Sequence, residues 1–208
     1  MLELVAIFVA GYLIGSIPTG YLVVKKKANV DIREAGSGKI GGYNVFDVTR
    51  SKSVGVLVGV LDAVKGFAAV YGAGLLSLGS FSLQAVALFG AIAGHNYPVW
   101  LRFKGGRGLS TTAGGLFLLG FSYAVVWCAL WLVGRLLRRD ILTSNLIAIL
   151  LTPAILGILP WEWVSYLNVV RADGGIFVFF SCILSLQLFL GHFDVVYAVW
   201  KQSKADVL

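Results

Sequence analysis

Long uncharged apolar segments constrain this chain more than any other feature of its sequence. Residues 110–134 contain no charged side chain, and the segments at 54–78, 81–99, 143–159 and 176–200 carry two or fewer. A helix of about 20 residues, rising about 1.5 Å per residue, crosses a hydrocarbon core roughly 30 Å thick. With 58% apolar and 13% charged residues, the chain does not have the composition of a soluble domain. The sequence therefore predicts an all-α integral membrane protein.

The alternation of apolar and polar stretches places the elements. Residues 2–24 begin with Glu3 rather than with basic residues, so they are predicted to be a retained span and not a signal peptide. The stretches that follow are predicted, in order, as a polar loop at 25–53, a helical hairpin at 54–78 and 81–99, a polar loop at 102–107, a helix at 143–159, a connector at 160–175 and a last helix at 176–200.

The distribution of Lys and Arg predicts the orientation, because basic residues near helix ends stay on the cytoplasmic side. With the amino terminus outside, residues 25–52, 102–107, 135–139 and the carboxyl-terminal tail are inside, and together they hold fifteen of the seventeen basic residues. Only Arg171 is outside, and Lys65 lies within a span. We therefore expect a multi-pass protein of the inner (cytoplasmic) membrane with its carboxyl terminus and its working loops in the cytoplasm.

This count requires residues 110–134 to enter and leave on the same side, although hydropathy alone would make them one crossing. We therefore predict a break near residues 120–123, with two short helices of about 17 Å each forming a re-entrant pair or a shallow hairpin. Five full crossings and this pair give seven transmembrane or half-membrane helices. Without an internal repeat, a single domain over residues 1–208 accounts for the chain.

The second polar loop carries the strongest chemical signal. Residues 94–108 read GHNYPVWLRFKGGRG and lead directly into a predicted helix. Glycines let backbone N–H groups approach an anion, a helix amino terminus adds partial positive charge, and Lys104 and Arg107 supply full charges. The pattern predicts a phosphate-binding loop, and the alternative is an ordinary cytoplasmic loop with glycine turns.

Other polar residues are open to two interpretations. Residues 36–44, GSGKIGGYN, could wrap a polar ligand or act as a flexible linker. His95 and His192 could bind phosphate or accept a proton, or could be packing residues. Asp62 and Lys65, three apart in one span, are expected to pair with each other or with a loop, since an unpaired charge in lipid is costly.

Four stretches together resemble the bacterial membrane glycerol-3-phosphate acyltransferases that use acyl phosphate as donor. These are GSIPTGYL at 15–22, DIREAGSGKIGGYN at 31–44, LDAVKG at 61–66 and GHNYPVWLRFKGGRG at 94–108. The resemblance implies a seven-helix enzyme that moves a fatty acyl chain from acyl phosphate to the 1-hydroxyl of glycerol 3-phosphate, giving lysophosphatidic acid. This is the first step of phospholipid synthesis.

The resemblance also implies site residues. Donor phosphate would be bound by Lys104, Gly105, Gly106, Arg107 and Gly108. Ser37 and Asn44 would line the site, His192 would stand for the histidine of a third motif, and a small polar side chain near the start of the fourth helix aligns with either Ser144 or Asn145. No acyl-enzyme motif is present, so the acceptor hydroxyl would attack directly, with its proton passing to His192 or to a substrate phosphate.

Departures from the family pattern fall in the half of the site that binds the acceptor. Lys39 stands where the family has Asn, Gly42 and Tyr43 replace Ala-Thr, Asp47 replaces an Arg that would bind acceptor phosphate, and Val195 replaces the Asn of the third motif. An anion at a phosphate site is strongly unfavourable, so Arg50 or Lys39 would take over, or the acceptor differs.

Two alternatives therefore accompany the acyltransferase prediction. One is a paralogue that uses a different phosphorylated acceptor, and the other is a non-catalytic membrane protein that binds phosphate or lipid. A transporter is disfavoured because no inverted repeat is present. Whether the chain is an acyltransferase or a non-catalytic relative, we expect its net charge of +7 to orient the protein and to attract anionic lipid and substrates rather than nucleic acid. No motif suggests a metal or an organic cofactor.

Overall fold

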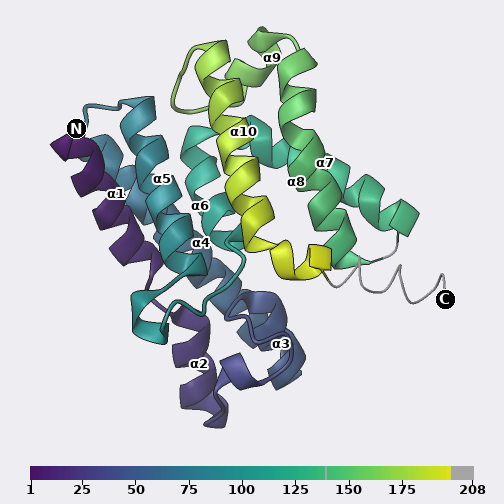
Figure 1. Cartoon of the computed structure of the whole chain (residues 1–208). Coiled ribbons are helices and arrows are strands. Elements are labelled where there is room, and N and C mark those ends of the chain that lie inside the picture. The colour runs from purple at the N-terminus through teal and green to yellow at the C-terminus, as the bar shows by residue number, and fades with distance from the viewer. Residues whose placement is uncertain (139, 198–208) are drawn as a thin grey trace. The chain divides into compact units, whose positions relative to one another are not determined.

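The computed structural model describes residues 1–138 and 140–197, and the regular elements in these residues are helices (Figure 1). The chain divides into two compact units. The first unit holds residues 1–120 and 168–171, and the second holds residues 121–167 and continues from residue 172. The predicted all-α class is confirmed for the described residues, whereas one domain over residues 1–208 stays a prediction.

The first unit is a bundle in which α1 packs against α5, and α4 packs against both α5 and α6. Its elements are α1 (Leu2–Gly15), α2 (Thr19–Ala28), the 3₁₀ turn η1 (Ile32–Glu34), α3 (Gly42–Thr49), α4 (Lys52–Leu76), α5 (Phe81–Asn96), the 3₁₀ turn η2 (Val99–Leu101) and α6 (Leu109–Leu119). The predicted hairpin is confirmed as α4 and α5.

Glycines let α1 and α5 approach backbone to backbone. A Cβ atom on Gly15 would lie 2.0 Å from the carbonyl oxygen of Ala91, and one on Gly94 would lie 2.1 Å from that of Tyr12. Small residues at helix contacts are the usual basis of close packing inside membranes, where burial of apolar surface gives no driving force between helices. This contact therefore fixes the end of α5 from which the 97–108 loop begins.

The first span is not one continuous helix. Helix α1 ends at Gly15 and α2 begins at Thr19, with Pro18 between them. Proline has no backbone N–H and its ring clashes with the preceding turn, so the ladder of hydrogen bonds stops there. The predicted span over residues 2–24 is therefore divided between two helices, and residues 2–28 together are long and apolar enough for one crossing.

The polar stretch at 25–53 is not the loop that we predict from sequence. It contains the end of α2, the turn η1 and the eight-residue helix α3. Helix α3 packs against α4, and its Val45 is fully buried. The sequence conceals α3 because glycines precede it and charged residues follow it, so its few apolar residues do not stand out in a hydropathy pattern.

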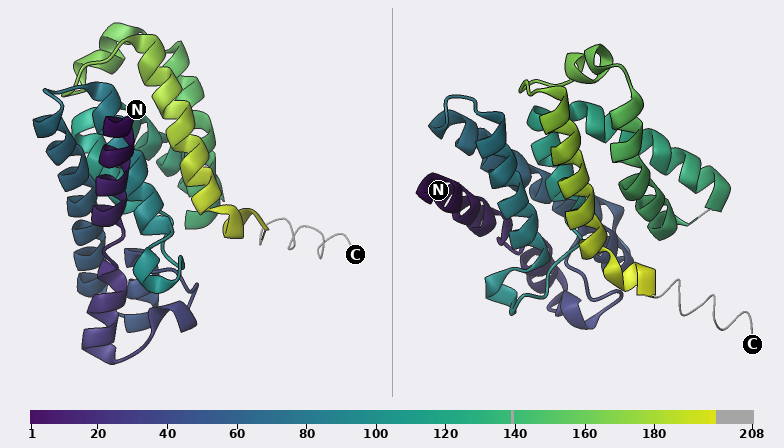
Figure 2. Two further views of the ribbon diagram at one scale, coloured as in Figure 1. Left: turned by 60° about the vertical axis from the view of Figure 1, so that its left-hand side comes forward. Right: turned by 45° about the horizontal axis from the view of Figure 1, so that its top comes forward.

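Among the described residues, four helical segments are long and apolar enough to cross a membrane, namely residues 2–28, 52–76, 141–158 and 174–191. Helix α5 has 16 residues, shorter than the full crossing predicted at 81–99. In the first unit, the start of α1 and the turn between α4 and α5 lie at one end, while α2, α3 and the 97–108 loop lie at the other (Figure 2).

In the second unit, α7 packs against α8, and α8 packs against α10. The bounds are α7 (Phe121–Arg138), α8 (Ile141–Ile158), α9 (Trp161–Tyr166) and α10 (Gly174–Gly191). The predicted break within 110–134 is confirmed, since α6 ends at Leu119 and α7 starts at Phe121. Helix α7 is, however, 18 residues long, or about 27 Å, and exceeds the expected 17 Å. The predicted connector at 160–175 contains α9.

Candidate active site

The 35–41 loop folds around the side chain of Asn44, which is buried at the start of α3. The Asn44 amide nitrogen donates to the carbonyl oxygens of Lys39 at 2.8 Å and Ala35 at 3.1 Å. Its Oδ1 accepts from the Ser37 N–H at 2.9 Å. Gly36 and Gly38 turn the chain with positive φ of 58° and 69°. One side chain thus fixes both ends of the loop and sets the positions of Ser37 and Lys39.

This role of Asn44 differs from the one that the sequence suggests. Both of its amide protons are engaged by loop carbonyls, so it can donate to a substrate only by releasing the loop. Ser37 is exposed and Lys39 is half-buried. Among the described residues, no carboxylate pairs with the Lys39 ammonium, whereas the exposed Arg50 forms an ion pair with Asp47 at 3.0 Å.

Arg33 links the region of the 35–41 loop to the 97–108 loop. Its guanidinium contacts the Asp31 carboxylate at 2.6 Å, lies over the Tyr21 ring at 5.2 Å, and donates to the Leu101 carbonyl oxygen at 3.4 Å. The hydrogen bonds from Arg33 lower the pKa of Asp31 to about 2. The same contact raises the pKa of Arg33. This pair is therefore fully charged at neutral pH and fastens the two loops together.

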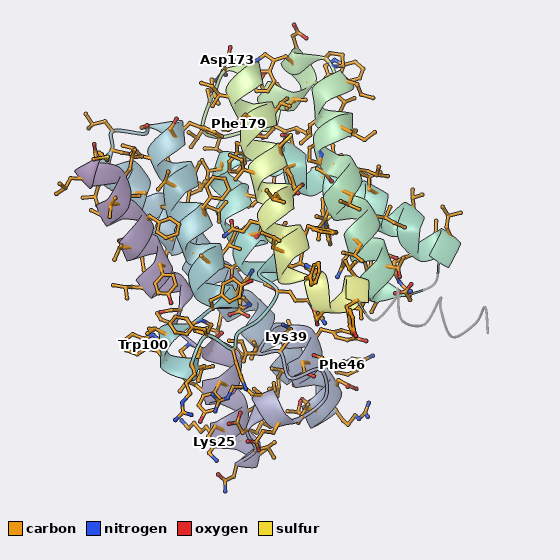
Figure 3. The ribbon with its side chains drawn as sticks, viewed as in Figure 1. Lys25, Lys39, Phe46, Trp100, Asp173 and Phe179 are labelled. Atoms are coloured by element: carbon orange, nitrogen blue, oxygen red, sulfur yellow. The ribbon has the colours of Figure 1, made fainter. Side chains whose placement is uncertain are left out.

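A small apolar core includes residues of both loops. It is formed by Val24 of α2, Ile32, Ile40, Val45 of α3, Val54 and Val58 of α4, and Leu101. Figure 3 shows Lys25, Lys39, Phe46 and Trp100 at this same end of the first unit. The basic and glycine-rich stretches, which are separate in the sequence, are thus joined by one apolar core.

The 97–108 loop turns sharply just before Lys104. Arg102 and Phe103 have φ of 53° and 62°, in the left-handed region that costs about 1–2 kcal/mol for a residue with a Cβ. Hydrogen bonds from the Phe103 N–H to the Pro98 carbonyl oxygen at 3.0 Å and from the Lys104 N–H to that of Leu101 at 3.2 Å hold the turn. The side chain of Lys104 is exposed. Strain of this kind is found at ligand-binding sites and turns.

Gly105 and Gly106 pack directly on His95 at the end of α5. The Gly106 N–H donates to the His95 carbonyl oxygen at 3.0 Å. A Cβ on Gly105 would lie 2.1 Å from that oxygen, and one on Gly106 would lie 2.0 Å from His95 Nε2. The sequence pattern predicts anion binding by these glycines, but the structure gives them a packing role as well, and the Gly106 N–H already donates to His95.

The amino terminus of α6 follows immediately and lacks a side-chain cap. Gly108 precedes it with φ of 87°, and the first helical bond runs from the Thr112 N–H to the Gly108 carbonyl oxygen at 2.8 Å. The N–H groups of residues 109–111 have no partner in the part of the chain that the structure describes, and the buried Thr111 and Thr112 hydroxyls have none either. Unused donors at a positive helix end favour an anion.

A buried group of charged and polar side chains lies beside this loop. The Asp62 carboxylate pairs with Lys65 at 2.9 Å, accepts a hydrogen bond of 2.5 Å from the Thr19 hydroxyl, and approaches His95 Nδ1 at 3.5 Å. Asp62, Lys65 and His95 are each 5% exposed or less. The predicted pairing of Asp62 with Lys65 is confirmed. Thr19 and His95 were not expected there, because no sequence spacing relates three different helices.

The other predicted site residues belong to the second unit. His192 is buried and forms the carboxyl-terminal cap of α10, which ends at Gly191. The helix predicted at 176–200 would instead contain His192. Its Nδ1 lies 2.8 Å from the Leu188 carbonyl oxygen. Ser144 and Asn145 are buried in the first turn of α8, and the Ser144 hydroxyl donates to the Asp140 carbonyl oxygen at 2.5 Å. Within residues 1–138 and 140–197, no three His, Cys, Asp or Glu side chains gather as metal ligands.

Comparison with known proteins finds matches along almost the whole chain. A family profile described as glycerol-3-phosphate acyltransferase matches residues 5–202. The glycerol-3-phosphate acyltransferase of Bradyrhizobium diazoefficiens is 40% identical over 184 residues, covering 88% of this chain and 85% of that protein. The glycerol-3-phosphate acyltransferase of Rhodopseudomonas palustris is 41% identical over 152 residues, or 73% of this chain and 76% of that protein.

Solved structures agree with these relatives. The crystal structure of PlsY (YgiH), an integral membrane glycerol 3-phosphate acyltransferase, in its glycerol 3-phosphate form, superposes with a TM-score of 0.76 at 27% identity. The match covers 96% of this chain and 92% of that chain. Its lysophosphatidic acid form gives a TM-score of 0.75. The chain is an integral membrane protein, and it belongs to the glycerol-3-phosphate acyltransferase family.

Proposed function

We propose that this chain transfers a fatty acyl group from acyl phosphate to the 1-hydroxyl of glycerol 3-phosphate, giving lysophosphatidic acid and inorganic phosphate. The acyltransferase activity with glycerol 3-phosphate is that of its family. Acyl phosphate as the donor is our proposal. The acceptor oxygen attacks the acyl carbonyl carbon, the bond from that carbon to the phosphate oxygen breaks, and phosphate leaves with the electron pair.

The uncapped start of α6 is the observation that carries the proposal for the donor. Three N–H groups and two threonine hydroxyls that have no partner among the described residues adjoin the cations Lys104 and Arg107 along residues 104–112. A phosphate there meets partial and full positive charge at once. The same charges stabilise the leaving phosphate as the bond breaks, which lowers the barrier to acyl transfer. Gly105, Gly106 and Gly108 let the backbone come close.

For the acceptor, we propose that Lys39 supplies the cation in place of the arginine that Asp47 replaces. The neighbouring Arg50 is already neutralised by Asp47. The Lys39 backbone, in contrast, is hydrogen-bonded to Asn44 beside Ser37, so the position from which the Lys39 side chain extends is fixed. We propose that Lys39 binds the phosphate of glycerol 3-phosphate and that the Ser37 hydroxyl contacts the reacting end of the same molecule.

Two residues of the second unit complete the proposal. A carbonyl oxygen can only accept, so His192 Nδ1 must carry the proton in its bond to Leu188, which makes Nε2 of the neutral ring a proton acceptor. We propose that Nε2 takes the proton of the attacking hydroxyl. Between the two aligned positions we favour Asn145 as a substrate contact, because the Ser144 hydroxyl already donates to Asp140.

The membrane arrangement is proposed on the basis of charge. We propose seven membrane helices in one domain, an outside amino terminus, a cytoplasmic carboxyl terminus and residence in the inner membrane. The grouping of α2, α3 and the 97–108 loop at one end of the first unit, opposite the start of α1, supports this orientation (Figure 2). Residues 25–52 and the 97–108 loop together hold ten of the seventeen basic residues. We expect the active loops to meet soluble glycerol 3-phosphate in the cytoplasm.

The test is release of inorganic phosphate from palmitoyl phosphate by the purified protein in detergent. Wild type should release phosphate only when glycerol 3-phosphate is present, and lysophosphatidic acid should form in equal amount. Lys104→Ala should lower kcat/KM for palmitoyl phosphate on the order of 100-fold, as expected for removing a charged contact to phosphate. Lys26→Ala, an exposed cation of α2, serves as the matched control and should behave like wild type.

The acceptor assignment is tested separately by varying glycerol 3-phosphate. Lys39→Ala should raise KM for glycerol 3-phosphate about tenfold or more, and Arg50→Ala should change it by less than about twofold. Phosphate release with equal rates in Lys104→Ala and wild type would refute the donor site. Turnover of palmitoyl phosphate only with some other acceptor would refute glycerol 3-phosphate as the acceptor.

A further inference from the structure

The break in the first span is attached to the 97–108 loop at three places. The Tyr12 hydroxyl, in the last turn of α1, donates to the Tyr97 carbonyl oxygen at 2.7 Å. The Trp100 indole N–H donates to the Ser16 hydroxyl at 2.9 Å. The third attachment runs through the buried carboxylate of Asp62. The contacts of Tyr12 and Trp100 do not involve the proposed phosphate-binding residues, whereas the third attachment reaches Gly106 through His95.

The third attachment joins three helices at one oxygen atom. Asp62 Oδ1 accepts from Thr19, the first residue of α2, and pairs with Lys65 of α4, while His95 of α5 lies 3.5 Å away. Lys65 also donates to the Ile17 carbonyl oxygen at 3.1 Å. That carbonyl lies in the break beside Pro18 and also accepts from the Thr19 N–H at 3.0 Å, so the buried ammonium is hydrogen-bonded to the broken part of the span.

His95 connects this buried group to Gly105 and Gly106. Its carbonyl oxygen accepts from the Gly106 N–H, and its ring lies where a Cβ of Gly106 would be. Gly105 is packed just as closely on the His95 backbone. A shift of His95 relative to α2 and α4 would therefore move Gly105 and Gly106, and with them the neighbouring Lys104.

The buried group is poorly arranged for stability alone. Asp62 Oδ2 and His95 Nδ1 are buried without a hydrogen-bond partner among the residues that the structure describes. Removing two charges from solvent and leaving such atoms unsatisfied is unfavourable, and well-packed apolar residues often replace buried ion pairs without loss. An imperfect buried pair that touches the base of a functional loop points instead to a role in geometry.

We infer that Asp62, with Lys65 and Thr19, is a positioning group that sets the 97–108 loop for donor phosphate through His95. This assigns a role to the two stretches at 15–22 and 61–66 that contain no proposed substrate contact. The inference rests on the proposed function, because it concerns the loop assigned to the donor. Displacing a binding loop by about 1 Å can cost on the order of 100-fold in rate, so a positioning group far from the substrate has a measurable effect.

Steady-state kinetics with both substrates varied, together with thermal unfolding, tests the inference on three variants. Asp62→Asn keeps the shape of the side chain and removes its charge, Lys65→Met removes the cation, and the double variant Asp62→Asn/Lys65→Met removes both. Gln84→Met is the control. Gln84 is a buried polar residue of α5, like His95, but it lies near the other end of that helix.

We expect each single variant to raise KM for palmitoyl phosphate about tenfold or more while KM for glycerol 3-phosphate changes by less than about twofold. The double variant should regain wild-type unfolding temperature, since no charge is left unpaired, but it should keep the raised donor KM. Gln84→Met should leave both KM values unchanged. If the single variants do not fold, the double variant still provides the donor KM.

Recovery of stability and donor KM together in the double variant would overturn the inference, because the pair would then be structural only. Equal rises in both KM values would overturn it too. The Lys104→Ala variant separates this outcome from failure of the proposed function. If Lys104→Ala loses donor binding and Asp62→Asn does not, the donor site stands and the positioning group is refuted. If Lys104→Ala has no effect, the donor site itself is wrong.

Discussion

Replacing Gly106 by alanine is the substitution whose effect follows most directly from the geometry. The new Cβ would lie 2.0 Å from His95 Nε2, and ordinary contact begins at 3.4 Å, so the loop or the ring must move by about 1.4 Å. Overpacking of this size costs about 1–3 kcal/mol of the free energy of unfolding. Because His95 is itself held by the buried group at Asp62, we expect much of the movement to fall on the loop.

The measurable consequence is a change in donor kinetics. We expect Gly106→Ala to raise KM for palmitoyl phosphate about tenfold or more in the phosphate-release assay, with KM for glycerol 3-phosphate within about twofold of wild type. Gly105→Ala should be more damaging, because its Cβ would meet backbone atoms of His95 and Asn96, which yield less than a side chain.

Gly41→Ala provides the matched control. It also changes a loop glycine, but nothing lies within 4 Å of its added Cβ, and its φ of −77° suits alanine. Gly41→Ala should therefore show wild-type donor KM and wild-type unfolding temperature. If Gly106→Ala behaved like Gly41→Ala in both assays, the close packing of the glycine pair on His95 would be wrong, and so would the reasoning built on it.

Three further predictions concern other contacts. Asn44→Ala should lower the free energy of unfolding by about 1–3 kcal/mol, measured by thermal unfolding, and raise KM for glycerol 3-phosphate, because the 35–41 loop loses its central side chain. Asp31→Asn should be less stable than wild type at pH 7. Since the pKa of Asp31 falls from 3.8 to about 2 on folding, that difference should shrink below about pH 4 and vanish near pH 2. Tyr123→Phe removes the buried 2.7 Å bond to Ser185, and unfolding should show a loss of about 1 kcal/mol with both KM values unchanged.

Hydropathy and glycine punctuation predict the long elements of this fold well. The α4–α5 hairpin follows from two apolar runs separated by a short turn. The break at Gly120 follows from the distribution of Lys and Arg on either side of residues 110–134. The pairing of Asp62 with Lys65 follows from helical spacing, because residues three apart share one face. In each of these cases a single local rule acts over a segment long enough to dominate its surroundings.

Contacts between distant elements escape such rules. The position of α3 depends on Val45 entering a core made by α2, α4 and Leu101. The role of Asn44 depends on loop carbonyls that face it only after the loop has folded. A usable signal was nevertheless present, since Asn44 directly precedes the apolar Val45 and Phe46, and an amide in such a setting is usually hydrogen-bonded to backbone.

The glycines of the 97–108 loop show why pattern and mechanism have to be separated. A glycine can be required because a ligand approaches the backbone or because another part of the protein does, and the sequence looks the same in both cases. Here the packing on His95 alone is sufficient to require Gly105 and Gly106. Loss of activity in a glycine variant therefore does not demonstrate phosphate binding. Substitutions that change charge without changing backbone contacts, at the exposed Lys104 and the half-buried Lys39, are the ones that test it.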